Sequence, residues 1–166
     1  LNSLPQQECG IGIDRRTKLG KGSAVLVGFS NFDERSKAFL DGVATELNAP
    51  DDLGHAFRVT QSVFYTLRDT IAMKDSRALV GRLPDDITAM YEDDWDTAKE
   101  RTSYETSEDF YNAVRENSLS VAEDLYSNTE VRQAVQAVFK VLKEPATESM
   151  WQRITDQLPE SLRSNL

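Results

Sequence analysis

The feature that most constrains this chain is an internal repeat at a constant offset of 75 positions. Residues 61–69 recur as residues 136–144, and residues 79–87 recur as residues 154–162. The alignment needs no insertion or deletion between these two matches. The apolar positions and a Leu-Pro step recur, whereas residue types that catalyse reactions do not. The repeat therefore predicts two copies of one packing arrangement rather than two copies of one active site.

Apolar residues recur at helical spacing in both copies. In the first copy, Phe39, Val43 and Leu47 follow one another at intervals of four, and Pro50 then breaks the pattern. A unit of three or four helices buries its apolar stripes poorly alone, so the sequence predicts an all-α fold in which two pseudo-repeated units of three or four helices pack as one helical bundle. In the first repeat we expect a helix capped by Ser30 or Asn31 and ending at Leu47, a helix capped by Asp51 or Asp52 and ending at Ile71, and two short helices over 76–83 and 85–91. In the second repeat we expect a helix capped by Thr106 or Ser107 and ending at Leu125, and a helix capped by Asn128 or Thr129 and ending at Leu142. A helix capped by Thr147 then runs through Ile154, and a terminal turn follows over 159–162.

The first thirty residues differ in composition from the rest, because they hold five of the eight glycines. Residues 11–14 and 24–27 either pair as a short hairpin or stay extended until a partner orders them. We therefore divide the chain into an extended or weakly β-paired arm (1–30), a first helical repeat (31–91), an acidic connector (92–105) and a second helical repeat (106–166).

Charge also separates the arm from the rest of the chain. Residues 11–30 carry four cations and one acid, a local charge of +3; since the whole chain carries −9, residues 31–166 carry −11 once Glu8 is set aside. An acidic body repels nucleic acid and anionic membrane, so we expect neither as the main partner. The basic arm suits a phosphate or an acidic protein surface, or else it is a flexible tail that keeps the chain soluble. The residues that we expect to bind a protein partner are Arg15, Arg16, Lys18, Lys21 and Phe29.

Composition limits the class of protein. No segment approaches the run of about 20 apolar residues that would span a bilayer, so we expect no transmembrane segment. The single cysteine, Cys9, excludes an internal disulfide and a cysteine-based zinc cluster, which fits a cytoplasmic protein, free or in peripheral association with a larger complex.

The titratable residues do not have the spacing of a catalytic or metal site. His55 shares a helix face with Asp51 and Asp52, a pairing that a metal site can use, but nothing nearby in sequence completes a set of three or four ligands. Cys9 has no basic neighbour before Arg15 to favour its thiolate, so it is a poor nucleophile.

Two short segments resemble ligand loops only in part. Residues 92–96 lack the alternation and the glycine of a calcium loop, and residues 20–23 lack the first glycine and the Lys-Ser/Thr step of a phosphate loop. We therefore predict no catalytic residue, no metal ligand and no cofactor, and we expect that the protein is not an enzyme.

Three short motifs carry a resemblance to a known family. They are the Val-Phe-x-x-Leu helix (Val63, Phe64, Leu67 and Val138, Phe139, Leu142), the Arg/Gln-Leu-Pro step (Arg82, Leu83, Pro84 and Gln157, Leu158, Pro159) and the aromatic connector from Tyr91 to Trp95 and Asp96. From about Phe32 to Leu166 the chain resembles the mainly prokaryotic domain-of-unknown-function family 2267, in which a glycine usually precedes the Trp-Asp pair; here that residue is Asp94. The resemblance implies an all-helical tandem fold and implies no activity, cofactor or catalytic residue.

These observations lead to a first hypothesis and two alternatives. The first is a non-enzymatic protein-interaction or accessory module, whose acidic helical body docks to a larger assembly through the N-terminal arm. The second is a small-ligand binding or regulatory protein with an aromatic cleft between the repeats, lined by Tyr91, Trp95 and Trp151. The third and weakest is a metalloenzyme that uses His55 with distant acids. The oligomeric state stays open.

Overall fold

A computed structural model of the chain describes residues 29, 31–118 and 127–166. The chain divides into two units, residues 1–32 and residues 33–166. In the first unit, the rings of Phe29 and Phe32 meet edge to face with their centroids 5.3 Å apart. The other predicted partner-binding residues, Arg15, Arg16, Lys18 and Lys21, lie outside the described residues. We call residues 33–166 the helical body.

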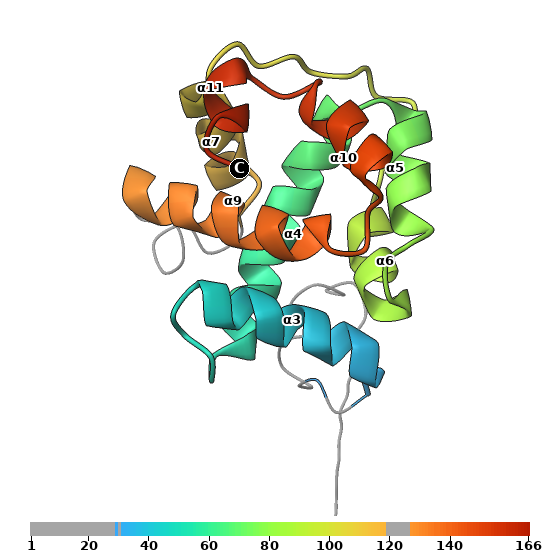
Figure 1. Ribbon diagram of the computed structural model, residues 1–166, viewed down its shortest axis with the longest axis vertical. Helices are drawn as coiled ribbons and strands as arrows, with labels where there is room; N and C mark the ends of the chain where they lie inside the picture. Colours follow the sequence, from blue (N-terminus) through green and yellow to red (C-terminus); the bar gives the residue numbers. More distant parts are fainter. Residues whose placement is uncertain (1–28, 30, 119–126) are drawn as a thin grey trace, which may run out of the picture. The chain divides into compact units, whose positions relative to one another are not determined.

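Every regular element in the described part of the helical body is an α-helix, which confirms the predicted all-α class and helical bundle (Figure 1). The helices are α3 (Glu34–Glu46), α4 (Leu53–Thr70), α5 (Met73–Val80), α6 (Asp85–Glu92), α7 (Ser107–Glu116), α9 (Asn128–Lys143), α10 (Glu148–Thr155) and α11 (Glu160–Arg163).

Short polar side chains at the N-cap explain where three of these helices begin. Asp52, Thr106 and Thr147 precede α4, α7 and α10, and each accepts a hydrogen bond from the backbone N–H three residues later, at 3.0–3.1 Å. Such a bond satisfies one of the amides that the first turn of a helix leaves without a partner. All three residues are among the caps that the sequence predicts.

Two other caps differ from the prediction because a residue nearby caps the helix instead. α3 is capped by Asp33 rather than by Ser30 or Asn31, and the Asp33 carboxylate accepts the backbone N–H three residues later at 2.8 Å. α9 is capped by Ser127, one residue before the predicted position. The Ser127 hydroxyl accepts the N–H of Glu130, and the Glu130 carboxylate accepts the N–H of Ser127, which forms a complete capping box.

Two helix boundaries are corrected as well. α5 begins at Met73 rather than at residue 76 and ends at Val80. No side chain of its own segment caps α5; the N–H of Ala72 instead donates to Gln157 Oε1 at 2.7 Å, a contact that spacing along the sequence does not show. α7 ends at Glu116, short of the predicted Leu125, which lies outside the described residues.

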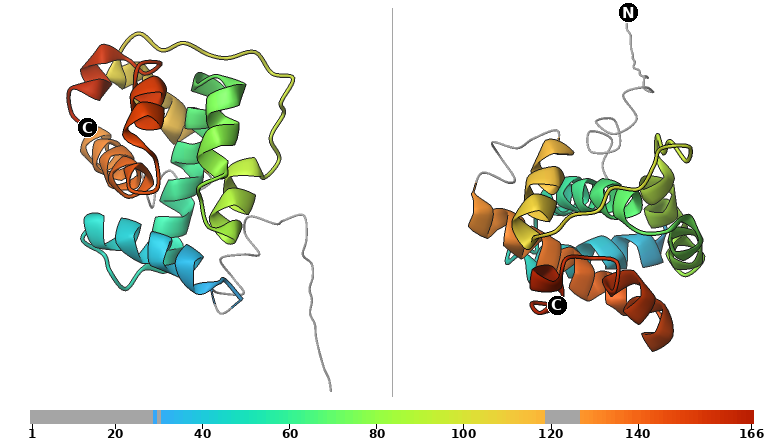
Figure 2. Two further views of the ribbon diagram at one scale, coloured as in Figure 1. Left: turned by 45° about the vertical axis from the view of Figure 1, so that its right-hand side comes forward. Right: turned by 90° about the horizontal axis from the view of Figure 1, so that it is seen from above.

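α4 lies in the middle of the helical body, where α3, α6, α7 and α9 all pack against it (Figures 1 and 2). Its burial extends to hydroxyl side chains, which need partners to leave water. The hydroxyls of Ser62, Thr66 and Thr70 each donate to the carbonyl four residues earlier, at 2.7–3.1 Å. These bonds within the helix satisfy three of its hydroxyls and allow α4 to pack on most of its faces. The hydroxyl of Thr60, also on α4, is buried without a partner among the described residues.

Three of the four corresponding pairs of helix starts follow the offset of the sequence repeat, and the fourth pair, α3 and α7, starts 73 residues apart. α4 and α9 begin at residues 53 and 128, α5 and α10 at 73 and 148, and α6 and α11 at 85 and 160. The packed helix pairs also match: α3 packs on α4, α6 and α9, and α7 packs on α9, α11 and α4. That the two halves are copies of one unit stays a prediction, and these boundaries and pairs support it.

Two chains of aromatic rings form the centre of the core. One runs through Phe39, Phe64, Tyr91 and Trp95, and the other through Tyr104, Phe110, Phe139 and Trp151, with ring centroids 5.1–6.2 Å apart at each step. Phe64 on α4 and Phe139 on α9 are 0% and 1% exposed. Phe64 is therefore an inner ring of the first chain of rings, and Phe139 is an inner ring of the second.

We predict that Phe139→Ala destabilises the protein by about 3–5 kcal/mol, because it removes a fully buried ring and leaves a cavity. Urea unfolding followed by circular dichroism measures the free energy of unfolding. Gln133→Ala, an exposed position on the same helix, serves as the matched control and should change stability by less than about 0.5 kcal/mol. A loss at Phe139 no larger than that of the control would contradict this account of the core.

Candidate functional site

Side chains of α4 hold the predicted acidic connector where it leaves α6. The Arg68 guanidinium donates to the carbonyls of Tyr91, Asp93 and Asp94, at 2.6, 2.8 and 3.2 Å, and lies 4.2 Å from the centroid of the Tyr65 ring. The last carbonyls of a helix have no partner within it, so a cation that binds several of them both caps α6 and fixes the exit of the chain.

Burial shifts the pKa values of this cluster. Burial, together with the Asp93 carboxylate that accepts the Tyr65 hydroxyl at 2.6 Å, raises the pKa of Tyr65 well above its usual value. Burial also raises the pKa of Tyr91, whose hydroxyl lies 2.6 Å from Ser76 Oγ, and lowers the pKa of the Arg68 guanidinium. Shifted pKa values mark catalytic sites and structural networks alike. Here each hydroxyl has a structural partner, so the cluster serves to hold the connector.

Further along, the connector is fastened to the end of α4. Lys99 Nζ lies 2.7 Å from the Asp69 carboxylate, and the Thr102 N–H donates to the Asp69 carbonyl at 2.8 Å. The side chain of Arg101 donates to the Thr70 carbonyl at 3.2 Å. The cavity beneath this segment has a volume of about 120 Å³, which suits a few water molecules better than a ligand.

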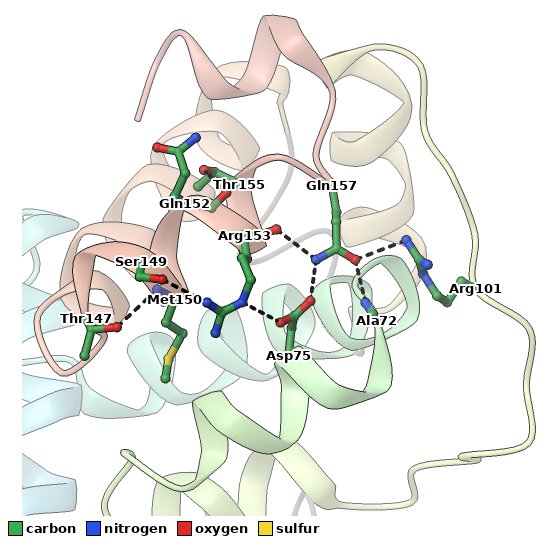
Figure 3. A network of polar contacts seen from close by, with 10 residues as sticks. All are labelled: Ala72, Asp75, Arg101, Thr147, Ser149, Met150, Gln152, Arg153, Thr155 and Gln157. Atoms are coloured by element: carbon green, nitrogen blue, oxygen red, sulfur yellow. Dashed lines mark hydrogen bonds and ion pairs between the residues drawn. The ribbon is translucent and has the colours of Figure 1, made fainter.

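A second polar network joins α5 to α10 and to the segment that follows α10 (Figure 3). Asp75 has a side chain only 5% exposed, and it accepts from Arg153 at 3.3 Å and from Gln157 at 2.8 Å. The side-chain oxygen of Gln157, Oε1, in turn accepts from the Ala72 N–H and from the Arg101 side chain, at 2.7 and 3.1 Å. The carboxylate thus has the charge partner and the hydrogen bonds that burial demands, and it joins segments far apart in sequence.

The residue before each Leu-Pro step reaches into the opposite half of the sequence. Gln157 accepts the N–H of Ala72, between α4 and α5, and Arg82 donates to the carbonyl of Pro145, between α9 and α10. The first residue of each Arg/Gln-Leu-Pro motif therefore forms a hydrogen bond that joins the two halves of the sequence.

The three aromatic residues predicted to line one cleft do not come together in the described part of the chain. Tyr91 is fully buried and packs on Trp95, with the ring centroids 5.7 Å apart. Trp151 instead packs on Phe139 at 5.9 Å, and it lines a different hollow from Trp95. The prediction of a single aromatic cleft between the repeats is therefore wrong. Tyr91 and Trp95 pack on each other at the core, and of the three residues Trp151 alone lines a hollow large enough for a ligand.

That hollow, which we call the α9 groove, has a volume of about 420 Å³, within the range of small-molecule sites. Its walls are the end of α3 (residues 46–48), one side of α9, Trp151 of α10 and residues 165–166. The side chains that give it chemical character are Gln133, Gln136, Phe139, Lys140, Lys143 and Trp151. Spacing along α9 places the groove residues from Gln133 to Lys143 on one side of that helix, but their meeting with α3 and with Trp151 of α10 is tertiary and has no signal in the sequence.

Of the remaining sequence candidates, His55 is not among the residues that line this groove. The His55 N–H donates to the Asp52 cap at 3.0 Å in the first turn of α4, and Cys9 lies outside the described residues. Within residues 29, 31–118 and 127–166, no three His, Cys, Asp or Glu side chains gather as a metal ion would require. No helix in that same part of the chain has both the length and the apolarity to cross a membrane.

Comparison with known families agrees with the resemblance drawn from the three motifs. The model of the DUF2267 family, described as an uncharacterized conserved protein, matches residues 36–164, which is most of the helical body. A comparison with curated proteins finds no significant match.

We predict that Asp75→Asn lowers the free energy of unfolding by about 2–4 kcal/mol, because it leaves Arg153 without its charge partner and disturbs the bonds to Gln157. Chemical denaturation measures the change. Asp156→Asn is the matched control, since Asp156 is 54% exposed and pairs with Arg163 at 3.6 Å, a surface arrangement that contributes little. Equal effects of the two substitutions would show that the buried network does not stabilise the body.

We also predict that Tyr65 and Tyr91 ionise only as the protein unfolds in alkali. Their pKa values are raised above that of an unfolded tyrosine, about 10. Their contribution to stability is therefore complete below that pH and is lost as the pH rises further. An alkaline titration should follow phenolate absorbance and circular dichroism together, in wild type, Tyr65→Phe and Tyr91→Phe. In wild type, the absorbance step that coincides with loss of helix should be larger than in either variant. Ionisation of both residues in the folded protein would refute the prediction.

Proposed function

The chain belongs to the DUF2267 family, and we propose from its own residues that it is a non-enzymatic interaction module, with an acidic helical body that docks to a larger protein assembly through its basic N-terminal arm. The observation that carries the proposal is the division of charge. Residues 11–30 carry +3, whereas residues 31–166 carry −11. A cationic segment that precedes an acidic body in the sequence suits an acidic surface on a protein partner, because the body itself repels nucleic acid and anionic membranes. The proposal places the protein in the cytoplasm, in peripheral association with that assembly.

The use of buried and half-buried charged groups within the body supports the non-enzymatic part of the proposal. Arg68 caps α6, Asp69 holds Lys99, and Asp75 holds Arg153 and Gln157. Each of these groups stabilises a junction between segments. A general acid or base must instead face a substrate with its reactive atom free to exchange a proton.

A second candidate function, small-ligand binding or regulation, is favoured by the α9 groove. Its volume of about 420 Å³ and its mixture of buried aromatic and exposed polar side chains are those of a ligand site. The two functions are compatible, because the groove belongs to the helical body and the proposed docking segment is the arm.

We predict that deletion of residues 1–30 abolishes capture of the protein partner and leaves the helical body folded. Co-purification from the native host followed by mass spectrometry identifies proteins retained by the full chain and lost by the truncated chain. Circular dichroism and thermal melting should show nearly unchanged helix content and melting behaviour. Retention of the same partners by the truncated chain would refute docking through the arm.

Charge variants make this test sharper. Replacement of Arg15, Arg16, Lys18 and Lys21 by glutamine should weaken capture as the deletion does. The matched control replaces four exposed cations of the helical body by glutamine: Arg35, Lys74, Arg77 and Arg132. If both sets of substitutions weaken capture equally, the arm has no special part in docking.

A further inference from the structure

One side of α9 presents two amides and then two cations to the α9 groove. Gln133, Gln136, Lys140 and Lys143 all line the groove, at positions that share one face of a helix. The stripe runs from Gln133 to Lys143, ten residue steps along the helix, or about 15 Å at 1.5 Å per step. That length accommodates several residues of an extended peptide at about 3.3 Å each.

The polar groups of this stripe differ in whether they already have partners. Lys140 forms an ion pair with Glu46 of α3, with Nζ and Oε2 3.1 Å apart. Lys143 is exposed and pairs with no acid in the described part of the chain. The side-chain amides of Gln133 and Gln136 likewise have no partner among the described residues. The groove therefore offers one uncompensated cation and two amides that can each donate and accept.

The floor of the groove is apolar and stays in contact with the core. Phe139 and Trp151 are 1% and 7% exposed, and their rings pack edge to face. Ala137 lies beside them at 4% exposure, and Leu47 and Leu166 stand on the walls. Such a floor suits one aromatic or branched apolar side chain, because flat rings pack well on an exposed edge of tryptophan.

We propose that the α9 groove binds an apolar amino acid residue through its free carboxylate, its preceding amide and its side chain, an inference that rests on the ligand-binding candidate function. The carboxylate pairs with Lys143, the acyl amide exchanges hydrogen bonds with Gln133 and Gln136, and the apolar side chain lies on Phe139 and Trp151. Two sources share this chemistry: a free N-acyl amino acid, and the C-terminal residue of a partner protein.

The test uses N-acetyl-L-phenylalanine as the carboxylate probe and N-acetyl-L-phenylalaninamide as its uncharged analogue. A Trp95→Phe background leaves Trp151 as the only tryptophan, so a change in its fluorescence reports occupancy of the groove. Isothermal titration calorimetry measures the affinity independently. We expect the carboxylate to bind and the uncharged analogue to bind about tenfold more weakly, the effect of losing one hydrogen bond to a charged group.

Lys143→Met should weaken binding of the carboxylate by about tenfold for the same reason. Lys74→Met, at an exposed lysine of α5 outside the groove, should leave the affinity unchanged. Circular dichroism of both variants establishes that they fold. Three results would each overturn the inference: no binding of the carboxylate up to its solubility limit, equal binding of the uncharged analogue, or an affinity that Lys143→Met does not lower.

A third probe, an acetylated tetrapeptide that ends in phenylalanine with a free carboxylate, distinguishes the two sources. Tighter binding of the tetrapeptide than of N-acetyl-L-phenylalanine supports the C-terminus of a protein, and equal binding supports a free N-acyl amino acid. A thermal-shift screen separates this inference from the candidate function beneath it. If an uncharged ligand from the screen perturbs Trp151 fluorescence while N-acetyl-L-phenylalanine does not bind, the carboxylate assignment is overturned and the ligand-binding function is retained. Neither of these two measurements bears on docking through the arm.

Discussion

The helical body depends on the packing of α4 against α9 around two buried phenylalanines. Phe64 and Phe139 lie in the middle of the two chains of aromatic rings, and neither is more than 1% exposed. Removal of one such ring from water contributes about 1.5–3 kcal/mol, before the cost of any cavity is counted. α3 and α7 each pack on both of these helices, so their positions follow once α4 and α9 have met.

The burial of α4 accounts for the polar chemistry around it. A helix buried on most of its faces loses free energy for each hydroxyl or charge that it buries without a partner. The hydroxyls of Ser62, Thr66 and Thr70 find partners within the helix, and Arg68 and Asp69 in its last turns bind the connector, whereas the buried Thr60 hydroxyl has no partner among the described residues. The raised pKa values of Tyr65 and Tyr91 are therefore consequences of packing. The same constraint explains Asp75, whose buried carboxylate is matched by Arg153 and Gln157.

Local signals in the sequence predict most of the helix starts; two missed caps lie at nearby residues, and a tertiary contact explains the missed start of α5. Asp52, Thr106 and Thr147 are recognisable because a short polar residue stands just before an apolar stripe. The start of α5 is missed because its first amide is bound by Gln157, 85 residues away from Ala72 along the chain. The predicted cleft fails for a related reason. Periodicity identifies Trp151 as an inward-facing residue, but it does not show which hollow the ring faces.

The α9 groove lies where the two halves of the sequence differ in the size of their side chains. In the first half, Phe64 is covered by Tyr91, which fits against Ser76, with Trp95 behind it. At the offset of 75 positions, Tyr91 corresponds to Leu166, which is 40% exposed, and Ser76 corresponds to Trp151.

The large ring that covers the core in the first half is therefore replaced by a small, exposed side chain in the second. The edge of Trp151 then forms part of the groove wall instead of being covered. α6 extends over Asp85–Glu92, whereas its counterpart α11 covers only Glu160–Arg163. The helix at this position is therefore shorter in the second half than in the first. Under the predicted repeat, Gln136 and Phe139 of the groove match Gln61 and Phe64 of the first half, so these positions alone do not produce a hollow. The hollow lies beside Trp151 and Leu166, the positions at which the side chains of the two halves differ most in size.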